Sequence, residues 1–179
     1  MEAGAYSVTE NQNIAGEPRD TLTFKDATPA ATGRLPGGTT LGSIFALGAM
    51  MRSAQMAGAM EWILEASVQY ANDRVQFGRA IGKFQAIQQS MAELAGHTAA
   101  SGAASTGAFQ AADLAQQSGL DSTFEIAAAK TRISEAAGIA AAISHQIHGA
   151  IGFTYEHDLH FRTRRLWSWR DEFGSDSYW

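Results

Sequence analysis

Apolar residues recur at steps of three and four along most of the chain, which is the period of an α-helix with one buried face. The pattern predicts four helices joined by short connections. They cover residues 41–72, residues 84–118, a segment from residue 121 or 122 to residue 149, and residues 156–169. Helices joined by short turns pack as antiparallel neighbours, so we expect an all-α fold, an antiparallel four-helix bundle.

The same spacing indicates which side chains face the core. They include Leu47, Met51 and Trp62 in the first helix, Ile87, Met91, Leu94, Phe109 and Leu114 in the second, Ile126, Ile133, Ile139 and Ile143 in the third, and Leu159 and Leu166 in the fourth. Gly119 is a suitable stop for the second helix, because glycine adopts the left-handed conformation that commonly ends helices. Asp121 or Ser122 then caps the third helix.

The first 38 residues differ from the rest of the chain. Thr21 to Phe24 alternate polar and apolar residues as a half-buried strand does, and Pro29, Gly33 and Pro36 are typical of a loop. A single strand needs neighbours for its backbone groups. We therefore interpret residues 1–38 as the remnant of a sheet domain with its linker, rather than as a strand that pairs with another chain, and residues 39–179 as the helical domain.

Composition narrows the function. The net charge of −5 and pI near 5.5 disfavour nucleic acid as a partner and favour small molecules or proteins. No cysteine is present, which excludes disulfides and thiol catalysis. Residues 1–16 lack the pattern of a secretory signal, and the apolar residues 41–59 are interrupted by Arg52 and Gln55, so we expect no membrane span and a cytoplasmic protein.

Several common site patterns are weak or missing. His145 and His148, with His157, Asp158 and His160 further on, raise the possibility of a metal site. However, a di-iron bundle would need a glutamate three residues before a histidine, and none occurs, so we expect no metal. The phosphate-binding glycine motifs and the Gly-x-Ser-x-Gly elbow are also missing. A basic run at Arg162, Arg164 and Arg165 fits either an anion site or a salt-bridged helix face beside Trp167 and Trp169.

Two segments are more specific. Residues 70–88 read YANDRVQFGRAIGKFQAIQ, and residues 146–154 read QIHGAIGFT. The first closely resembles the helix-turn-helix junction of acyl-CoA dehydrogenases, Tyr-x-x-x-Arg-x-x-Phe-Gly followed by Phe-Gln-x-Ile-Gln. The second is similar to that family's Gln-x-x-Gly-Gly-x-Gly-Tyr segment. The resemblance covers about four fifths of the chain as the family's C-terminal helical domain, and residues 21–36 resemble the end of its middle sheet domain.

The resemblance implies FAD as the cofactor, held mainly by a second subunit. Arg74 matches the arginine that pairs with the FAD pyrophosphate, for which a planar guanidinium is well suited. Phe77 and Gln85 lie where the family reaches the same cofactor. The segment of Gln146, His148, Gly149 and Ala150 resembles the one that closes over the adenosine and pyrophosphate, with Ala150 in place of the usual second glycine. The alternative for the first motif is that Arg74 forms a salt bridge at a helix end and Phe77 belongs to the core.

The family removes a proton beside the acyl-CoA thioester with a glutamate while hydride passes to the flavin. The usual position of that glutamate corresponds to Phe173, before Gly174 and Ser175, and the position used by a minority of members corresponds to Ala49. Neither side chain accepts a proton. Glu172, one residue from the usual position, is therefore the best catalytic candidate.

The resemblance leads to two hypotheses. In the first, the chain is the C-terminal part of a flavin-dependent acyl-CoA dehydrogenase that contributes FAD contacts and oligomer interface, acts with electron-transfer flavoprotein or another acceptor, and is inactive alone. Residues 156–160 and 173–174 resemble a divergent bacterial branch, in which a degenerate subunit can accompany a catalytic one in fatty acid or steroid degradation. In the second, the chain is a non-catalytic helical assembly module or degenerate partner that binds no flavin.

Overall fold

The computed structural model of the protein describes residues 6–33, 39–119 and 121–179. These residues form four α-helices, α1 (Leu41–Asp73), α2 (Gln85–Ser118), α3 (Thr123–His148) and α4 (Leu159–Trp169), and two 3₁₀ helices, η1 (Ile81–Lys83) and η2 (Gly149–Phe153). Strands β1 (Tyr6–Thr9) and β2 (Thr21–Phe24) form one antiparallel hairpin, and β3 (Val75–Gln76) and β4 (Arg79–Ala80) form another.

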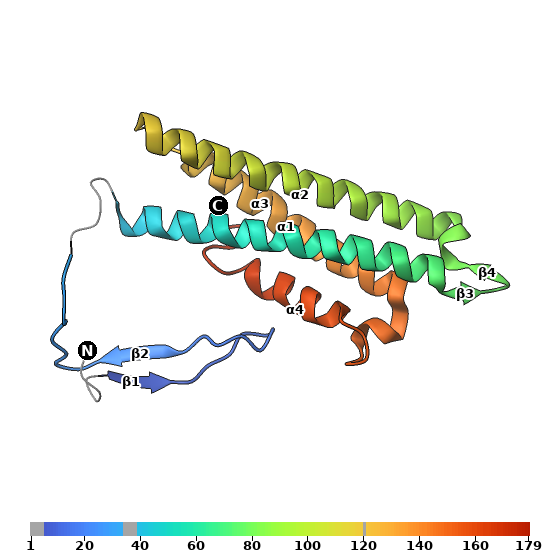
Figure 1. Cartoon of the computed structure of the whole chain (residues 1–179), viewed down its shortest axis with the longest axis horizontal. Helices are drawn as coiled ribbons and strands as arrows, with labels where there is room; N and C mark the ends of the chain where they lie inside the picture. The colour runs from blue at the N-terminus through green and yellow to red at the C-terminus, as the bar shows by residue number, and fades with distance from the viewer. Residues whose placement is uncertain (1–5, 34–38, 120) are drawn as a thin grey trace.

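The three long helices lie side by side and alternate in direction (Figure 1). Helices α1, α2 and α3 all pack against one another, and the shorter α4 packs on α1 and α3. In Figure 1, α4 lies on the side of α1 that is opposite to α2. The predicted all-α, antiparallel four-helix bundle is confirmed.

Local hydrogen bonds explain where the helices begin and end. At the start of α1, Ser43 N donates to Thr40 Oγ1 at 3.0 Å while Thr40 N donates to Ser43 Oγ at 2.8 Å, which satisfies two backbone donors of the first turn. Gly119 has φ of 73° and ends α2, as predicted. Asp121, rather than Ser122, accepts from the backbone of Thr123, at 2.9 Å, before α3.

The fourth helix begins later than predicted. It starts at Leu159 instead of residue 156, because the backbone amide of Leu159 donates to Nδ1 of His157 at 3.1 Å and the preceding residues form turns. The turns follow η2, which begins at the expected glycine end of α3. Gly149, with φ of 65°, takes a conformation that favours glycine.

The core contains Met56, Met60, Ile63, Leu94, Ile133, Leu159 and Leu166, all fully buried. The predicted face of α1 was wrong at Leu47 and Met51, which are 47% and 57% exposed, whereas the predicted Trp62 is partly buried against the core. The buried face instead carries small residues such as Ala49 and Ser53 beside Met50. Because α1 is apolar on several sides, its spacing fits more than one face, and small side chains let the neighbouring helices approach closely. Phe109 and Leu114 of α2 are likewise partly exposed rather than buried.

The strand predicted at Thr21 to Phe24 is β2, and it has a partner that the sequence analysis missed. Strand β1 pairs with it in the register Tyr6↔Phe24 and Val8↔Leu22, so two apolar pairs share one face of the hairpin. Residues 1–5 and 34–38, including the predicted loop residue Pro36, lie outside the described residues. The domain boundary near residue 38 stays a prediction. Among the described residues, no helix has the length and apolarity that a bilayer crossing requires.

Candidate functional site

The first motif forms a tight turn at one end of the bundle. Helix α1 ends at Asp73, and Ile81 N donates to the carbonyl of Arg74 at 2.8 Å, which closes the β3–β4 hairpin at the start of α2. Phe77 and Gly78, at the tip, have φ of 52° and 79°, so both occupy the left-handed region. Such a two-residue turn suits the twist of a hairpin.

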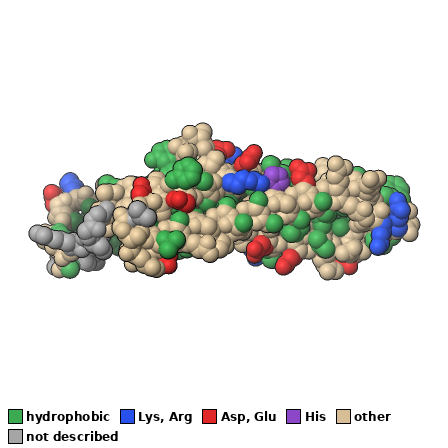
Figure 2. Space-filling view, turned by 90° about the horizontal axis from the view of Figure 1, so that it is seen from above, with side chains coloured by type: hydrophobic (Ala, Val, Ile, Leu, Met, Phe, Trp, Pro, Cys, Tyr) green, Lys and Arg blue, Asp and Glu red, His purple; other side chains and the backbone are tan. Residues whose placement is uncertain are grey.

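This turn presents an aromatic ring and several cations to solvent. The Phe77 side chain is 93% exposed, so it does not belong to the core. Arg74, Arg79 and Lys83 are also exposed, and within the described residues none of the three takes part in an ion pair. Basic side chains gather at this end in Figure 2. Gln85 lies exposed in the first turn of α2, at the same end.

The second motif lies at the C-terminal end of α3. Tyr70, one turn before Arg74, donates from its hydroxyl to the carbonyl of His148 at 3.3 Å, and its ring stacks on the His148 ring with centroids 4.5 Å apart. The contact joins the end of α1 to the end of α3, so the structure brings the two motifs to one end of the bundle. His148 itself is buried, whereas Gln146, Gly149 and Ala150 are exposed.

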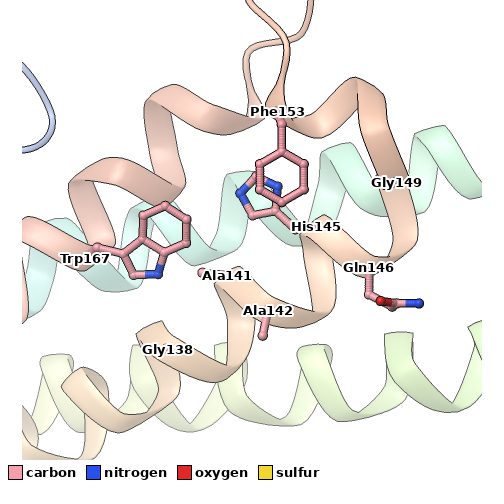
Figure 3. A pocket seen from close by; sticks show the side chains of 8 residues that line it. All are labelled: Gly138, Ala141, Ala142, His145, Gln146, Gly149, Phe153 and Trp167. Carbon is pink, nitrogen blue, oxygen red and sulfur yellow. The ribbon is translucent and has the colours of Figure 1, made fainter.

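A hollow of about 470 Å³ lies beside Gln146, between α3, η2 and α4 (Figure 3). It is lined by Gly138, Ala141, Ala142, His145, Gln146, Gly149, Phe153 and Trp167. The His145 ring stacks on Phe153 at 4.1 Å and on Trp167 at 5.7 Å. Its lining thus combines small residues with three aromatic rings. Gln146 and Gly149 of the second motif line this hollow, whereas Arg74 of the first motif does not.

Two histidines at this end, His145 and His148, are buried and have lowered pKa values. Burial lowers the pKa of His145, and the nearby His148 and His160 lower it further. Burial also lowers the pKa of His148, against the hydrogen bond between its Nδ1 and the carbonyl of Ser144 at 2.8 Å. Among the described residues, no group of three or more histidine or acidic side chains is arranged to hold a metal ion.

The basic run of α4 is occupied by contacts within the chain. Arg162 lies over the Trp62 ring, with 4.9 Å from its guanidinium carbon to the ring centroid. Arg164 donates to the carbonyl of Ile14, and Arg165 pairs with Glu17 at 3.1 Å. Of the two interpretations of this run, the structure therefore favours the salt-bridged, aromatic-covered face.

Glu172 lies in the same network of charges. Its carboxylate accepts from Arg19 Nε at 2.9 Å and pairs with Arg52 at 2.6 Å. Burial opposes ionisation, but hydrogen bonds from Arg19 and Asn13 and the charge of Arg52 leave the pKa of Glu172 below its usual value. A carboxylate held by two arginines is a weaker proton acceptor than a free one.

Phe173, after α4, packs against α1 next to Ala49 in the sequence. The Phe173 ring packs so closely on Gly48, the neighbour of Ala49, that a β-carbon at Gly48 would lie 2.4 Å from two ring atoms. Phe173 also stacks edge-on against Phe45 at 5.8 Å, in an aromatic cluster with Tyr178 and Trp179. The Phe173 ring is therefore held between α1 and the C-terminal residues.

Three features of the structure were not predicted from the sequence. The stacked rings of His145, Phe153 and Trp167 come from three elements, so no local pattern reveals them. The partners of Glu17 on α4, Arg165 and Trp169, lie 148 and 152 residues away in the chain. Lys130, in contrast, could have been found from the sequence, because it lies on the apolar face of α3 between Ile126 and Ile133.

The comparison with known proteins identifies the family of this chain. The profile of the family described as acyl-CoA dehydrogenase, C-terminal domain, matches residues 37–170. The match covers well over half of the chain, and the chain therefore belongs to the acyl-CoA dehydrogenase family through this helical domain.

Among its relatives, acyl-CoA dehydrogenase IpdE2 of Mycolicibacterium smegmatis is 32% identical over 169 residues, which are 92% of this chain and 50% of that protein. IpdE2 of Mycobacterium tuberculosis is 39% identical over 117 residues, 65% of this chain and 34% of that protein. The chain thus spans half or less of the length of these curated relatives.

Solved structures share the fold. The ChsE4-ChsE5 complex from Mycobacterium tuberculosis superposes with a TM-score of 0.82 at 23% identity, over 99% of this chain and 48% of that chain. Butyryl-CoA dehydrogenase from Megasphaera elsdenii gives a TM-score of 0.82 at 24% identity, also over 99% and 48%. At these identities the likeness concerns the fold alone.

Proposed function

We propose that this chain is the C-terminal helical part of a flavin-dependent acyl-CoA dehydrogenase that contributes contacts to an FAD held mainly by a second subunit. The observation that supports it is the solvent-exposed turn that carries Arg74 and Phe77 with the neighbouring Arg79 and Lys83. A pyrophosphate requires charge-assisted donors, and these cations are free of ion pairs within the described residues. The exposed Gly149 allows a ligand to approach the backbone.

In this proposal the chain's own residues bind and orient the cofactor. Arg74 pairs with a phosphate oxygen, Phe77 covers part of the flavin nucleotide, and Gln85 and Gln146 offer side-chain amides. The buried His148 contacts Tyr70 through its ring and its carbonyl, and thereby holds the end of α3 against the end of α1, where the turn with Arg74 begins. When bound, FAD supplies the hydride acceptor.

We further propose that the chain provides no base for proton removal. Phe173 and Ala49 lack a proton acceptor, and Glu172, the sequence candidate, is held by Arg19 and Arg52. A general base near neutral pH needs a pKa close to that pH, whereas these contacts lower the pKa of Glu172. The glutamate that deprotonates the acyl-CoA substrate then belongs to a partner subunit. In this proposal, electron-transfer flavoprotein or another acceptor takes the electrons from the reduced flavin, and the protein is cytoplasmic.

The proposal is tested by flavin absorption. We expect the chain, assembled with its second subunit, to retain oxidised FAD, and the Arg74→Ala variant to bind FAD about tenfold more weakly, on the scale of one charge-assisted phosphate contact. The matched control is Arg132→Ala, which removes an arginine on α3 that pairs with Glu135. Equal flavin retention by all three proteins would contradict the role of Arg74.

The second candidate is a non-catalytic assembly module that binds no flavin. A specific observation favours it, namely the row of exposed apolar side chains along α1 formed by Leu41, Ile44, Leu47 and Met51. Such a stripe is typical of a protein interface. Absence of flavin from both the wild-type assembly and the Arg74→Ala variant, with the assembly itself intact, would favour this candidate.

A further inference from the structure

A lysine is buried between α3 and the turn that follows α4. Lys130 of α3 is completely buried, although lysine is among the residues least often found inside a protein. Its ammonium donates to the carbonyl of Gly174 at 2.6 Å, to the carbonyl of Arg170 at 2.7 Å and to Ser134 Oγ at 3.3 Å. Its three donors therefore meet three acceptors, as a buried cation requires.

The charge of this ammonium is balanced by the turn that it contacts. Burial lowers the pKa of Lys130 to about 8, and Asp171 and Asp176 oppose that decrease. Arg170 adds to the decrease, while Glu172, paired with Arg52 of α1, opposes it. The charged form thus predominates at pH 7.

The two carbonyls that bind Lys130 flank Phe173. Phe173 and Gly174 have φ of 55° and 92°, so the chain turns sharply there through two left-handed residues. That turn points the Phe173 ring at Gly48 of α1, and Trp179 Nε1 donates to the Phe173 carbonyl at 2.9 Å. A non-glycine residue with positive φ persists only when its surroundings hold it.

We propose that Lys130 is a positioning residue, which clamps the carbonyls of residues 170 and 174 and thereby fixes the side chain of residue 173 against α1. The importance of this place for the reaction rests on the proposed function, because residue 173 corresponds to the position of the family's glutamate. The clamp itself depends only on the contacts described above. Lys130 acts through the backbone of the turn and touches no reacting atom.

The test uses proton NMR of the whole chain. One α-proton of Gly48 points at the Phe173 ring, so its resonance is shifted upfield, and Phe173→Ala gives the unshifted reference. Lys130→Met keeps an unbranched side chain but removes the ammonium. In this variant we expect the Gly48 α-proton to lose its upfield shift and to resonate where it does in Phe173→Ala. The methyl resonances of Ile63, Leu94 and Ile133 report on the bundle core and are expected to keep their dispersion. Lys25→Met, on the exposed segment after β2, is the matched control.

An unchanged Gly48 shift in a folded Lys130→Met protein would overturn the proposal. If that variant does not fold, the wild-type protein decides through its lysine ammonium signals. A clamped Lys130 gives ammonium protons that exchange slowly with water and show cross-peaks to residues 170 and 174, whereas rapid exchange refutes the clamp. None of these signals depends on flavin, so a failure of the proposed function would appear separately, in the absorption experiment.

Discussion

At the scale of single residues, two glutamates hold the N-terminal hairpin segment to the helices. Glu17 accepts from Trp169 Nε1 at 2.8 Å and pairs with Arg165, while Arg19 bridges Glu17 to Glu172. Burial alone would raise the pKa of Glu17, but hydrogen bonds from Asn13, Trp169 and the two arginines lower it to about 2. Both glutamates therefore stay ionised in the folded chain and tie the β1–β2 loop to α4.

Acid should loosen this attachment. Because the pKa of Glu17 is lower in the folded chain than its usual value of 4.5, its stabilisation is complete above pH 4.5 and is lost as the pH falls towards 2. For Glu17→Gln we expect a free energy of unfolding about 1–2 kcal/mol lower at pH 6, a value discounted for solvent screening, and a smaller loss between pH 4.5 and pH 2. Urea unfolding at several pH values measures both. Parallel pH profiles for the two proteins would contradict the assignment.

The sequence allowed correct predictions for residues whose roles depend on their immediate neighbours in the chain. Gly119 was predicted correctly, and the predicted choice between Asp121 and Ser122 included the capping residue, because such roles at helix ends depend on the neighbouring backbone. The buried face of α1 was not predicted correctly, because alanine, methionine and glycine occur on all sides of that helix and its packing against α3 selects the buried face. The partners of Glu172 could not be predicted either, since Arg19 lies 153 residues away in the chain.

At the scale of elements, the contact between α1 and the turn after α4 depends on a glycine. Gly48 has no side chain, and the Phe173 ring occupies the space that a β-carbon would take. The Phe173 ring also packs on Phe45, which in turn contacts Tyr178 and Trp179. The close approach of these two elements therefore requires glycine at position 48.

Replacing this glycine tests the contact against a control on the same helix. In Gly48→Ala, the methyl group displaces the Phe173 ring, and overpacking costs about 1–3 kcal/mol, partly offset by about 1 kcal/mol of helix propensity. Gly58→Ala meets no atom within 4 Å and should instead stabilise α1 by up to about 1 kcal/mol. Thermal or urea unfolding of the two variants compares them directly. Similar stabilisation by both would show that Phe173 does not rest on Gly48.

At the scale of the whole molecule, stability should depend on pH near neutrality through the histidines at the end of α3. His145 and His148 have pKa values lowered by burial, so the unfolded chain binds more protons than the folded chain below the usual histidine pKa of 6.5. The free energy of unfolding therefore falls as the pH drops from 7 towards 5.

A single substitution isolates the contribution of His148. His148→Phe keeps a ring to stack on Tyr70 but cannot take up a proton, so we expect a flatter dependence of stability on pH between 5 and 7. Chemical unfolding monitored by circular dichroism provides the measurement. An unchanged slope would assign the dependence to His145 or to other groups.

The length of α1 has a consequence for how the chain can change. At about 1.5 Å per residue, the helix holds Gly48 and Asp73 about 38 Å apart, so the turn that carries Arg74 and the turn that carries Phe173 share no contacts. Substitutions separated by such a distance act independently. A substitution at position 173 should therefore leave the turn around Arg74 unchanged, and a substitution at position 74 should leave the contact between Phe173 and Gly48 unchanged, so the two ends of α1 can change independently.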